Sequence, residues 1–288
     1  MNPLNPLKRY LFQIFTIHRD LLLLPLVFLE KKGSHRIACI TRNFRANLYN
    51  YPVRFFYDKL VNQYYILDDG EKHYFGDRDR GFGIYSKGLV SRRDSLVESY
   101  HLKHIEFSNS DIVIDCGANY ADLFLYFKDI IKPSNYITFE PGKEEFNVIK
   151  LNAPHSTNIN LGLGNENTVK NFYVNERDAD SSFIKPHTYS KVVKMQTTTL
   201  SSFIKKNKIK KIKLLKLEAE GFEPEILEGA SDVISLIEYV SIDGGFERGV
   251  NQDETLTYQT NFLLKNNFKM LKIFMWHGTG IRALFKRN

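Results

Sequence analysis

The segment VIDCGANYAD, residues 113–122, constrains the fold of this chain more than any other. Two apolar residues lead into Asp115, a tight turn follows through Gly117 and Asn119, and the apolar stretch from Leu123 onward is predicted to be helical. A strand, a glycine turn and a helix in this order form the nucleotide pocket of α/β folds. The segment therefore predicts a pocket at the carboxyl end of a parallel strand.

From residue 111 onward, candidate strands and helices alternate along the chain. The predicted strands cover 111–115, 135–140, 157–163, 212–219, 238–243, 268–275 and 281–286, and the predicted helices cover 120–131, 142–152, 198–207, 222–236 and 253–266. Such alternation predicts an α/β domain with a mostly parallel, doubly wound sheet. The last two strands are expected to form a terminal antiparallel hairpin.

The residues before this pattern are predicted to form an N-terminal α+β addition. Residues 35–76 are rich in aromatic side chains and are predicted to form strands, with a turn at Asp69-Gly70, while residues 85–105 have helical spacing. We therefore expect an apolar and basic segment at 1–34, an aromatic β-rich and helical addition at 35–108, and the α/β domain at 109–288.

The net charge and the cysteine content limit which partners and which cellular compartment are expected. The net charge of +7 favours an acidic partner, such as a nucleotide-sugar, a phosphorylated lipid or a membrane surface. We expect no nucleic acid partner, because no recognised binding module accompanies the basic residues. With only two cysteines, Cys39 and Cys116, a reducing cytoplasm is expected.

An apolar run at residues 21–29 has basic residues on both sides. It is too short to span a bilayer, which needs about 20 residues. The run could pack as a helix on the protein body. Alternatively, residues 1–30 could touch a membrane peripherally, at its inner face.

The turn after the first strand lacks two of the glycines of a dinucleotide site. Asn119 and Ala121 stand in their places, and Asp122 follows in what is expected to be the first helical turn. An acidic side chain there would repel a phosphate. S-adenosylmethionine has no phosphate, so the turn favours this methyl donor over NAD, and an NAD-dependent oxidoreductase is the alternative.

An acidic residue also ends the second predicted strand. Glu140 follows Asp115 by 25 residues and is placed to accept hydrogen bonds from both ribose hydroxyls of a nucleoside. The combination of the turn and the acid-tipped strand supports the cofactor prediction.

Several segments together resemble the FkbM family of S-adenosylmethionine-dependent methyltransferases. They are VIDCGANYAD, ITFEPGKEEFNVIKLNA, TTLSSFIKK, IKLLKLEAEGFEPEILEGA and YVSIDGGFERGV, within about residues 80–286. The resemblance implies a class I, Rossmann-like methyltransferase fold and O-methylation, often of sugar hydroxyls. It also implies a cofactor pocket formed by Asp115, Gly117, Asn119, Ala121 and Glu140.

Two positions depart from the family pattern. Ala121 stands where glycine is usual, which should be tolerated if Ala121 has helical geometry. Glu218 stands where aspartate is usual, and Glu220 and Gly221 match the family's glutamate and glycine.

Methyl transfer to a hydroxyl requires a proton acceptor. Glu218 and Glu220 are predicted to face one side at the end of the fourth strand, where their mutual repulsion would raise one pKa. Either is the expected base, and Asp243 after the fifth strand is the next candidate. Glu223, Glu225 and Glu228 are expected to lie on the exposed face of the next helix. Mg²⁺ could bind the clustered carboxylates at the strand ends, but no feature of the sequence requires a metal.

Three further residues are predicted to bind the acceptor. Ser181 and Ser182 lie in a polar loop, and Arg248 could clamp an anionic acceptor or form a structural salt bridge. The expected function is O-methylation of a sugar hydroxyl in surface polysaccharide or glycolipid biosynthesis, with an acceptor that could be nucleotide- or lipid-linked. A catalytically silent glycan-binding protein of the same fold is the other alternative.

Overall fold

The computed structural model describes residues 23–175, 180–276 and 280–288. The chain divides into two compact units, Met1–Gly88 and Leu89–Asn288. This division lies earlier than the expected boundary at 108, because residues from 89 onward contribute to the second unit. Leu96, Val97 and Tyr100 are buried in one of its hydrophobic cores.

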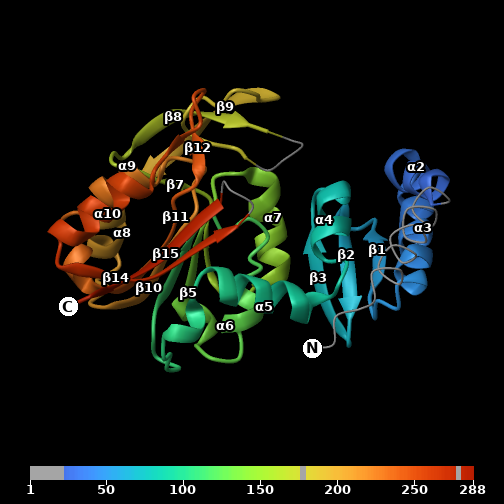
Figure 1. Cartoon of the computed structure of the whole chain (residues 1–288), viewed down its shortest axis with the longest axis horizontal. Helices are drawn as coiled ribbons and strands as arrows, with labels where there is room; N and C mark the ends of the chain where they lie inside the picture. The colour runs from blue at the N-terminus through green and yellow to red at the C-terminus, as the bar shows by residue number, and fades with distance from the viewer. Residues whose placement is uncertain (1–22, 176–179, 277–279) are drawn as a thin grey trace, which may run out of the picture. The chain divides into compact units, whose positions relative to one another are not determined.

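Among the described residues of the first unit, from 23 onward, two helices precede an antiparallel three-stranded sheet. The helices are α2 (Leu24–Lys32) and α3 (His35–Leu48), the strands are β1 (Arg54–Asp58), β2 (Gln63–Asp68) and β3 (Glu71–Phe75), and α4 (Arg78–Ile84) follows (Figure 1). Phe55, Phe75 and Phe82 form edge-to-face contacts in the core of this unit. The predicted turn at Asp69-Gly70 joins β2 to β3, and both of its residues have positive φ, as a tight hairpin requires.

The prediction of strands from residue 35 is wrong for residues 35–48, which form α3. The Ser34 side chain accepts a hydrogen bond from the backbone N–H of Ile37 and so caps this helix. Ala38, Arg42 and Ala46 are buried, and their spacing of four residues is that of a helix face. This helical spacing was the available signal, and the aromatic content of the following strands masked it.

The second unit contains a seven-stranded sheet. Its strands lie in the order β14-β15-β11-β10-β4-β5-β6, where the bounds are β4 (Val113–Cys116), β5 (Tyr136–Phe139), β6 (Thr157–Ile159), β10 (Ile212–Leu217), β11 (Ile237–Asp243), β14 (Phe268–Trp276) and β15 (Gly280–Arg287). The pairs from β11 to β6 are parallel, whereas β15 is antiparallel to both of its neighbours. The expected mostly parallel sheet with a terminal antiparallel hairpin is confirmed.

Helices cover both faces of this sheet (Figure 1). One core joins the sheet to α8 (Leu200–Lys206), α9 (Glu223–Gly229) and α10 (Leu256–Lys265). The other core joins it to α5 (Leu89–Ser99), α6 (Phe124–Phe127) and α7 (Lys143–Asn152). The central strands are buried on both faces, which is why each appears in the sequence as a nearly continuous apolar run.

Several smaller elements complete the second unit. A three-stranded sheet contains β7 (Gly162–Leu163), β8 (Thr168–Val174) and β9 (Lys191–Thr198), and a two-stranded ribbon contains β12 (Phe246–Arg248) and β13 (Asp253–Glu254). Short 3-10 helices span Leu102–His104, Pro133–Asn135 and Ile234–Leu236. The β8–β9 hairpin was not predicted, because most of its side chains are at least partly exposed and give no apolar run.

The strand order places a functional site at one edge of the sheet. The chain continues from β4 to β5 and β6 on one side, and returns to β10 and β11 on the other. Ligands of doubly wound folds bind outside the carboxyl ends of the strands at this switch point. The residues following β4, β5, β10 and β11 are therefore the candidates for the site.

Candidate active site

The turn after β4 can be made only with glycine at position 117. Gly117 has a φ of +71°, and a Cβ atom built on it would lie 1.8 Å from the carbonyl oxygen of Glu218. Its backbone N–H donates to the carbonyl of Phe139 at 2.9 Å, so the turn is attached to the end of β5. The close approach of the turn to the segment after β10 brings the three strand ends together.

Glu140 is linked directly to this turn. One of its carboxylate oxygens accepts the backbone N–H of Asn119 at 2.9 Å, and the other accepts that of Gly142 at 2.8 Å. Its burial and the neighbouring Glu145 carboxylate raise the pKa of Glu140 to about 8, although the two N–H groups lower it. Each oxygen accepts one of these bonds and keeps a lone pair with which to accept a ligand hydroxyl.

Ala121 does not have the expected helical geometry. Its φ is +59°, in the left-handed region, and its side chain is fully buried. A left-handed conformation costs a residue with a Cβ about 1–2 kcal/mol. The expectation for Ala121 is therefore wrong, and the turn tolerates alanine only at the cost of some backbone strain.

Asp122 is also placed differently from the expectation. It precedes α6, which begins at Phe124, and its carboxylate forms an ion pair with Arg92 at 2.7 Å. The predicted repulsion of a phosphate by Asp122 is weakened by this partner. The choice between cofactors must depend on other observations.

A chain of charges, all buried except the partly exposed Glu218, links the strand ends. Lys216 contacts Asp115 and Glu218, both at 3.0 Å, and donates to the carbonyl of Gly117 at 2.8 Å. Arg282 of β15 contacts Glu218 at 2.6 Å and Asp243 at 3.0 Å. We call these five residues, Asp115, Lys216, Glu218, Arg282 and Asp243, the buried charge chain. Three carboxylates share two cations in it.

Two predicted site residues are held by this chain and by their neighbours. Asp115 is buried and also accepts a hydrogen bond from the Tyr136 hydroxyl, so it supports the turn from within. Asp243 accepts hydrogen bonds from Arg282 and from the backbone N–H of Gly245. Its burial and the charge of Glu218 raise the pKa of Asp243.

Glu218 is bound too firmly to act as a base. β10 ends at Leu217, so Glu218 and Glu220 do not alternate along a strand as expected. The Tyr100 hydroxyl donates to Glu218, whose two oxygens also meet Lys216 and Arg282. Burial opposes the charged form, but the two cations outweigh it and hold the pKa of Glu218 well below its usual range. This carboxylate is a counter-ion and a poor proton acceptor.

Glu220 is the carboxylate of the predicted pair whose pKa is raised. Burial raises it most, and the carboxylates of Glu247 and Glu218 raise it further. Its backbone has a φ of +50°, and Gly221 follows with +88°. Strained backbone of this kind is common at functional sites. Gly221 is required here, because its Cβ would lie 2.6 Å from the Cα of Arg248.

Two acidic residues that the sequence analysis missed lie near Glu220. Glu223 is 1% exposed, contrary to the prediction of an exposed helix face, and accepts the N–H of Ala219 at 2.6 Å. Burial raises the pKa of Glu223 to about 7. Burial and the neighbouring carboxylates, Asp243 first, raise the pKa of Glu247 to about 9. A glutamate at the first position of a helix after a glycine turn was the only signal for Glu223.

The predicted acceptor residues are engaged within the protein. Ser182 is buried, donates to the carbonyl of Glu220 at 2.7 Å and accepts the N–H of Ile184, so its hydroxyl supports the segment that carries Glu220. The Ser181 hydroxyl accepts the N–H of Asn175 at 3.0 Å. Arg248 forms the competing structural salt bridge, with two contacts to Glu225 at 2.7 and 2.9 Å.

A comparison with protein families shows to which family the chain belongs. The profile of the methyltransferase FkbM domain matches residues 115–267, more than half of the chain. The chain belongs to the FkbM methyltransferase family. The match begins at the carboxylate of β4 and covers the strand ends described above. The FkbM domain is thus an S-adenosylmethionine-dependent methyltransferase domain, the class that the sequence predicted in preference to an NAD-dependent oxidoreductase.

Solved structures similar to the chain include three methyltransferases. TrmK from M. capricolum with S-adenosyl-homocysteine is 13% identical, with 67% of this chain and 68% of that chain covered and a TM-score of 0.39. Magnesium protoporphyrin IX methyltransferase from Synechocystis with bound SAM is 10% identical (73% and 90% covered, TM-score 0.42). TYW2 from M. jannaschii with AdoMet is 11% identical (78% and 87% covered, TM-score 0.37). The comparison with curated protein sequences returns no match.

The residues of the FkbM domain fit the cofactor. Glu140 has acceptor capacity for ribose hydroxyls, and the glycine turn at 117 brings the chain close without a side chain. Nothing in this arrangement requires a phosphate on the ligand. In the part of the chain that the structure describes, no group of three or more His, Cys, Asp or Glu side chains is arranged to hold a metal ion.

Replacement of Glu140 by alanine should weaken cofactor binding without unfolding the domain. The loss of hydrogen bonds from the ribose to a charged group should cost about 1.5–3 kcal/mol of binding free energy. Titration calorimetry with S-adenosylhomocysteine measures this effect. Unchanged affinity in the variant would show that Glu140 does not contact the nucleoside.

Nucleoside binding should also depend on pH through Glu140. Below a pKa of about 8 the free protein holds this carboxyl protonated, so a ligand that needs the ionised form must displace a proton. Affinity should then rise by up to about tenfold per pH unit toward pH 8 and level off above it. Methylthioadenosine is a suitable ligand, because it does not titrate in this range. Glu140→Gln should abolish the dependence of affinity on pH. A wild-type affinity that does not change across this pH range would contradict the prediction.

Proposed function

We propose that this methyltransferase transfers the methyl group to a sugar hydroxyl during assembly of a surface polysaccharide or glycolipid. The observation that supports this most is the Glu220 carboxylate, which has a raised pKa and follows the fourth parallel strand beside the cofactor turn. A hydroxyl is weakly acidic and needs such a proton acceptor, whereas a neutral amine does not. Membership of the FkbM family agrees with O-methylation.

In this proposal Glu220 and Glu218 have different roles. S-adenosylmethionine, when bound, supplies an electrophilic methyl group on a sulfonium. Glu220 would accept the hydroxyl proton as the C–O bond forms and the methyl–sulfur bond breaks, with the electron pair of that bond left on the sulfur. Glu218, held by Lys216 and Arg282, keeps its negative charge and fixes the position of the segment that carries Glu220. Catalysis then depends on alignment and on one proton transfer.

Methyl transfer from labelled S-adenosylmethionine to a panel of free, nucleotide-linked and lipid-linked sugars tests the proposal. We expect label in an alkali-stable methyl ether on one sugar position, and none with the Glu220→Gln variant. Transfer only to nitrogen or carbon acceptors would overturn the sugar hydroxyl assignment and leave the methyltransferase assignment intact.

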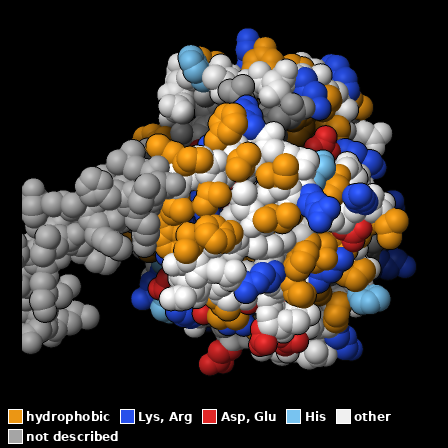
Figure 2. All heavy atoms as spheres, turned by 90° about the vertical axis from the view of Figure 1, so that its right-hand side faces the viewer, with side chains coloured by type: hydrophobic (Ala, Val, Ile, Leu, Met, Phe, Trp, Pro, Cys, Tyr) orange, Lys and Arg blue, Asp and Glu red, His pale blue; other side chains and the backbone are white. Residues whose placement is uncertain are grey.

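We further propose that the first unit contacts the inner face of a membrane. Leu24, Phe28 and Leu29 of α2 and Ile37, Ile40, Phe44 and Leu48 of α3 are exposed, and we call them the N-terminal apolar surface. Figure 2 shows apolar side chains gathered on the face of the molecule turned to the viewer. Lys31 and Lys32 at the end of α2 add positive charge for anionic lipids.

The structure describes only part of the predicted membrane segment at 1–30. Residues 1–22 lie outside the described part of the chain, so the surface is defined only from residue 23 onward. Among the described residues, no helix has the length and apolar character needed to cross a bilayer. The contact that we propose is peripheral.

Replacement of both Phe28 and Ile40 by serine should weaken binding to anionic vesicles. These side chains are 65% and 57% exposed, so the change should leave folding intact while removing apolar area from the lipid contact. We expect the affinity for the vesicles to fall by about tenfold or more, because a side chain that is fully buried contributes about 1.5–3 kcal/mol. Vesicle co-sedimentation measures it.

Leu60→Ser is the matched control, because Leu60 is 97% exposed in the same unit but follows β1. An equal loss in both variants, or none in either, would contradict a specific contact through α2 and α3.

A further inference from the structure

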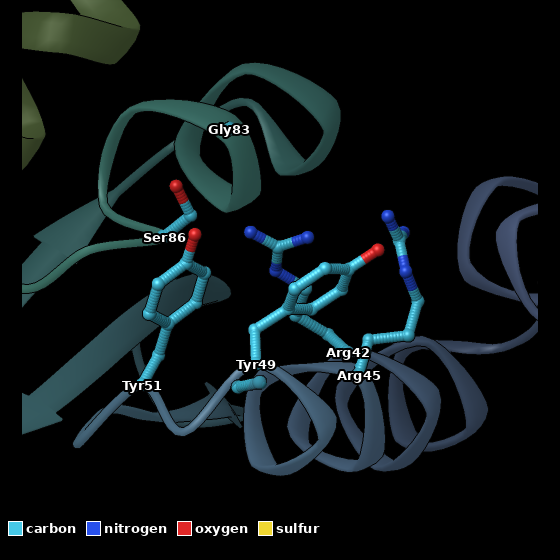
Figure 3. A pocket seen from close by; sticks show the side chains of 7 residues that line it. Arg42, Arg45, Tyr49, Tyr51, Gly83 and Ser86 are labelled. Carbon is cyan, nitrogen blue, oxygen red and sulfur yellow. The ribbon is translucent and has the colours of Figure 1, made fainter. Parts of the chain in front are cut away.

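The first unit contains a cavity whose lining residues all belong to that unit. Its volume is about 300 Å³, and it is lined by Arg42, Arg45, Ala46, Tyr49, Tyr51, Gly83 and Ser86. We call it the arginine–tyrosine pocket (Figure 3). Helix α3, the segment after it, helix α4 and the turn after α4 supply these residues. A cavity of this volume is within the range of small-ligand sites.

Two guanidinium groups of the pocket have unused donors. Arg42 is 9% exposed, donates to the carbonyl of Phe82, and has its Nη1 3.6 Å from Glu30. Arg45 donates to Glu30 at 2.7 Å. The Nε groups of both arginines are buried and have no hydrogen-bond partner among the described residues.

The charges of the pocket are not balanced by its own residues. Two guanidiniums share the single carboxylate of Glu30, which leaves one positive charge in a largely buried position. Burial lowers the pKa of Arg42, and the charge of Arg45 lowers it further, while Glu30 opposes the shift. A buried cation that lacks a full set of partners is costly, and a bound anion would remove that cost.

The other lining groups add donors and a flat apolar wall. In Figure 3 the hydroxyl of Tyr51 points toward Ser86, and the Arg42 guanidinium is drawn between the rings of Tyr51 and Tyr49. The rings of Tyr49 and Tyr51 are 5.7 Å apart and nearly parallel, at 18°. Hydroxyl and guanidinium donors together suit the oxygens of a phosphate, for which arginine is the preferred partner.

We propose that the arginine–tyrosine pocket binds a phosphate group of a small ligand. The phosphate oxygens accept hydrogen bonds from Arg42, Arg45 and the Tyr51 hydroxyl, and the rest of the ligand lies against the tyrosine rings. The phosphate could belong to a soluble sugar phosphate or to a lipid headgroup, and the experiment separates these two sources.

Gly83 offers a way to block the pocket without touching either arginine. A Cβ atom built on Gly83 meets no atom within 4 Å, so the space beside it is open. Gly83→Leu should fill part of the cavity, whereas Arg45→Gln removes a charge. Arg36→Gln is the matched control, since Arg36 is exposed on the same helix and does not line the pocket.

The full-length protein is titrated with inorganic phosphate and with glucose 1-phosphate by calorimetry. It is also sedimented with phosphatidylcholine vesicles that contain or lack phosphatidic acid. Loss of charge-assisted hydrogen bonds should weaken binding by about 10- to 100-fold in Arg45→Gln. Gly83→Leu should show a similar loss and Arg36→Gln no change. Urea unfolding of all three variants, followed by circular dichroism, checks that the first unit, which carries the changes, is folded.

Sensitivity of glucose 1-phosphate binding to the two pocket variants supports a soluble ligand. The same sensitivity only with phosphatidic acid vesicles supports a lipid headgroup. If no probe binds, or if Arg45→Gln and Gly83→Leu bind as the wild type does, the pocket is not a phosphate site.

Discussion

Replacing Glu220 by glutamine should reduce kcat by about 10²–10⁴-fold, the usual effect of losing a general base. Glutamine keeps the size of the side chain but cannot accept the acceptor's proton. Burial and the carboxylates of Glu247 and Glu218 raise the pKa of Glu220, which makes its ionised form a stronger base than an isolated glutamate. Single-turnover measurements with saturating S-adenosylmethionine measure the loss directly.

The wild-type rate should rise with pH, because only the ionised Glu220 accepts a proton, and this rise should disappear in the variant. Affinity for S-adenosylhomocysteine should be nearly unchanged, since the cofactor residues at the ends of β4 and β5 are untouched. Glu247→Gln is the matched control, because Glu247 lies near Glu220 and also has a raised pKa, of about 9. Near-normal turnover in Glu220→Gln with a large loss in Glu247→Gln would move the base to Glu247.

Replacing Lys216 by methionine should destabilise the protein by about 3–5 kcal/mol, as expected when one partner of a buried ion pair is removed. Lys216 is 2% exposed and holds the carboxylates of Asp115 and Glu218. It also donates to the carbonyl of Gly117, so the cofactor turn loses a contact when it is removed. Urea unfolding followed by circular dichroism gives the change in free energy of unfolding.

Lys205→Met is the matched control for this change. Lys205 also forms an ion pair, with Asp232 at 2.6 Å, but both side chains are more than half exposed. An exposed pair contributes about 0–1 kcal/mol. If Lys216→Met cost no more than Lys205→Met, the buried charge chain would not be what holds the strand ends together.

The large sheet could be predicted from the sequence because its strands are buried on both faces. Val113, Ile114 and their counterparts in β5, β10 and β11 form short apolar runs, and such runs between helical segments have few other interpretations. The helix α3 and the β8–β9 hairpin were missed. In both, exposed side chains interrupt the apolar pattern, so local sequence alone does not distinguish helix from strand.

The sequence by itself determined which residues meet at the site, since Asp115, Gly117, Glu140, Glu218 and Glu220 end or follow strands that a parallel sheet must bring to one edge. The tertiary structure decided what each carboxylate can do. Glu218 receives Tyr100 from 118 residues before it and Arg282 from 64 residues after it, and its pKa falls. Glu220 has the carboxylates of Glu247 and Glu218 nearby, and its pKa rises. The ionisation of a side chain depends on burial and on neighbouring charges, and only the folded chain brings those together.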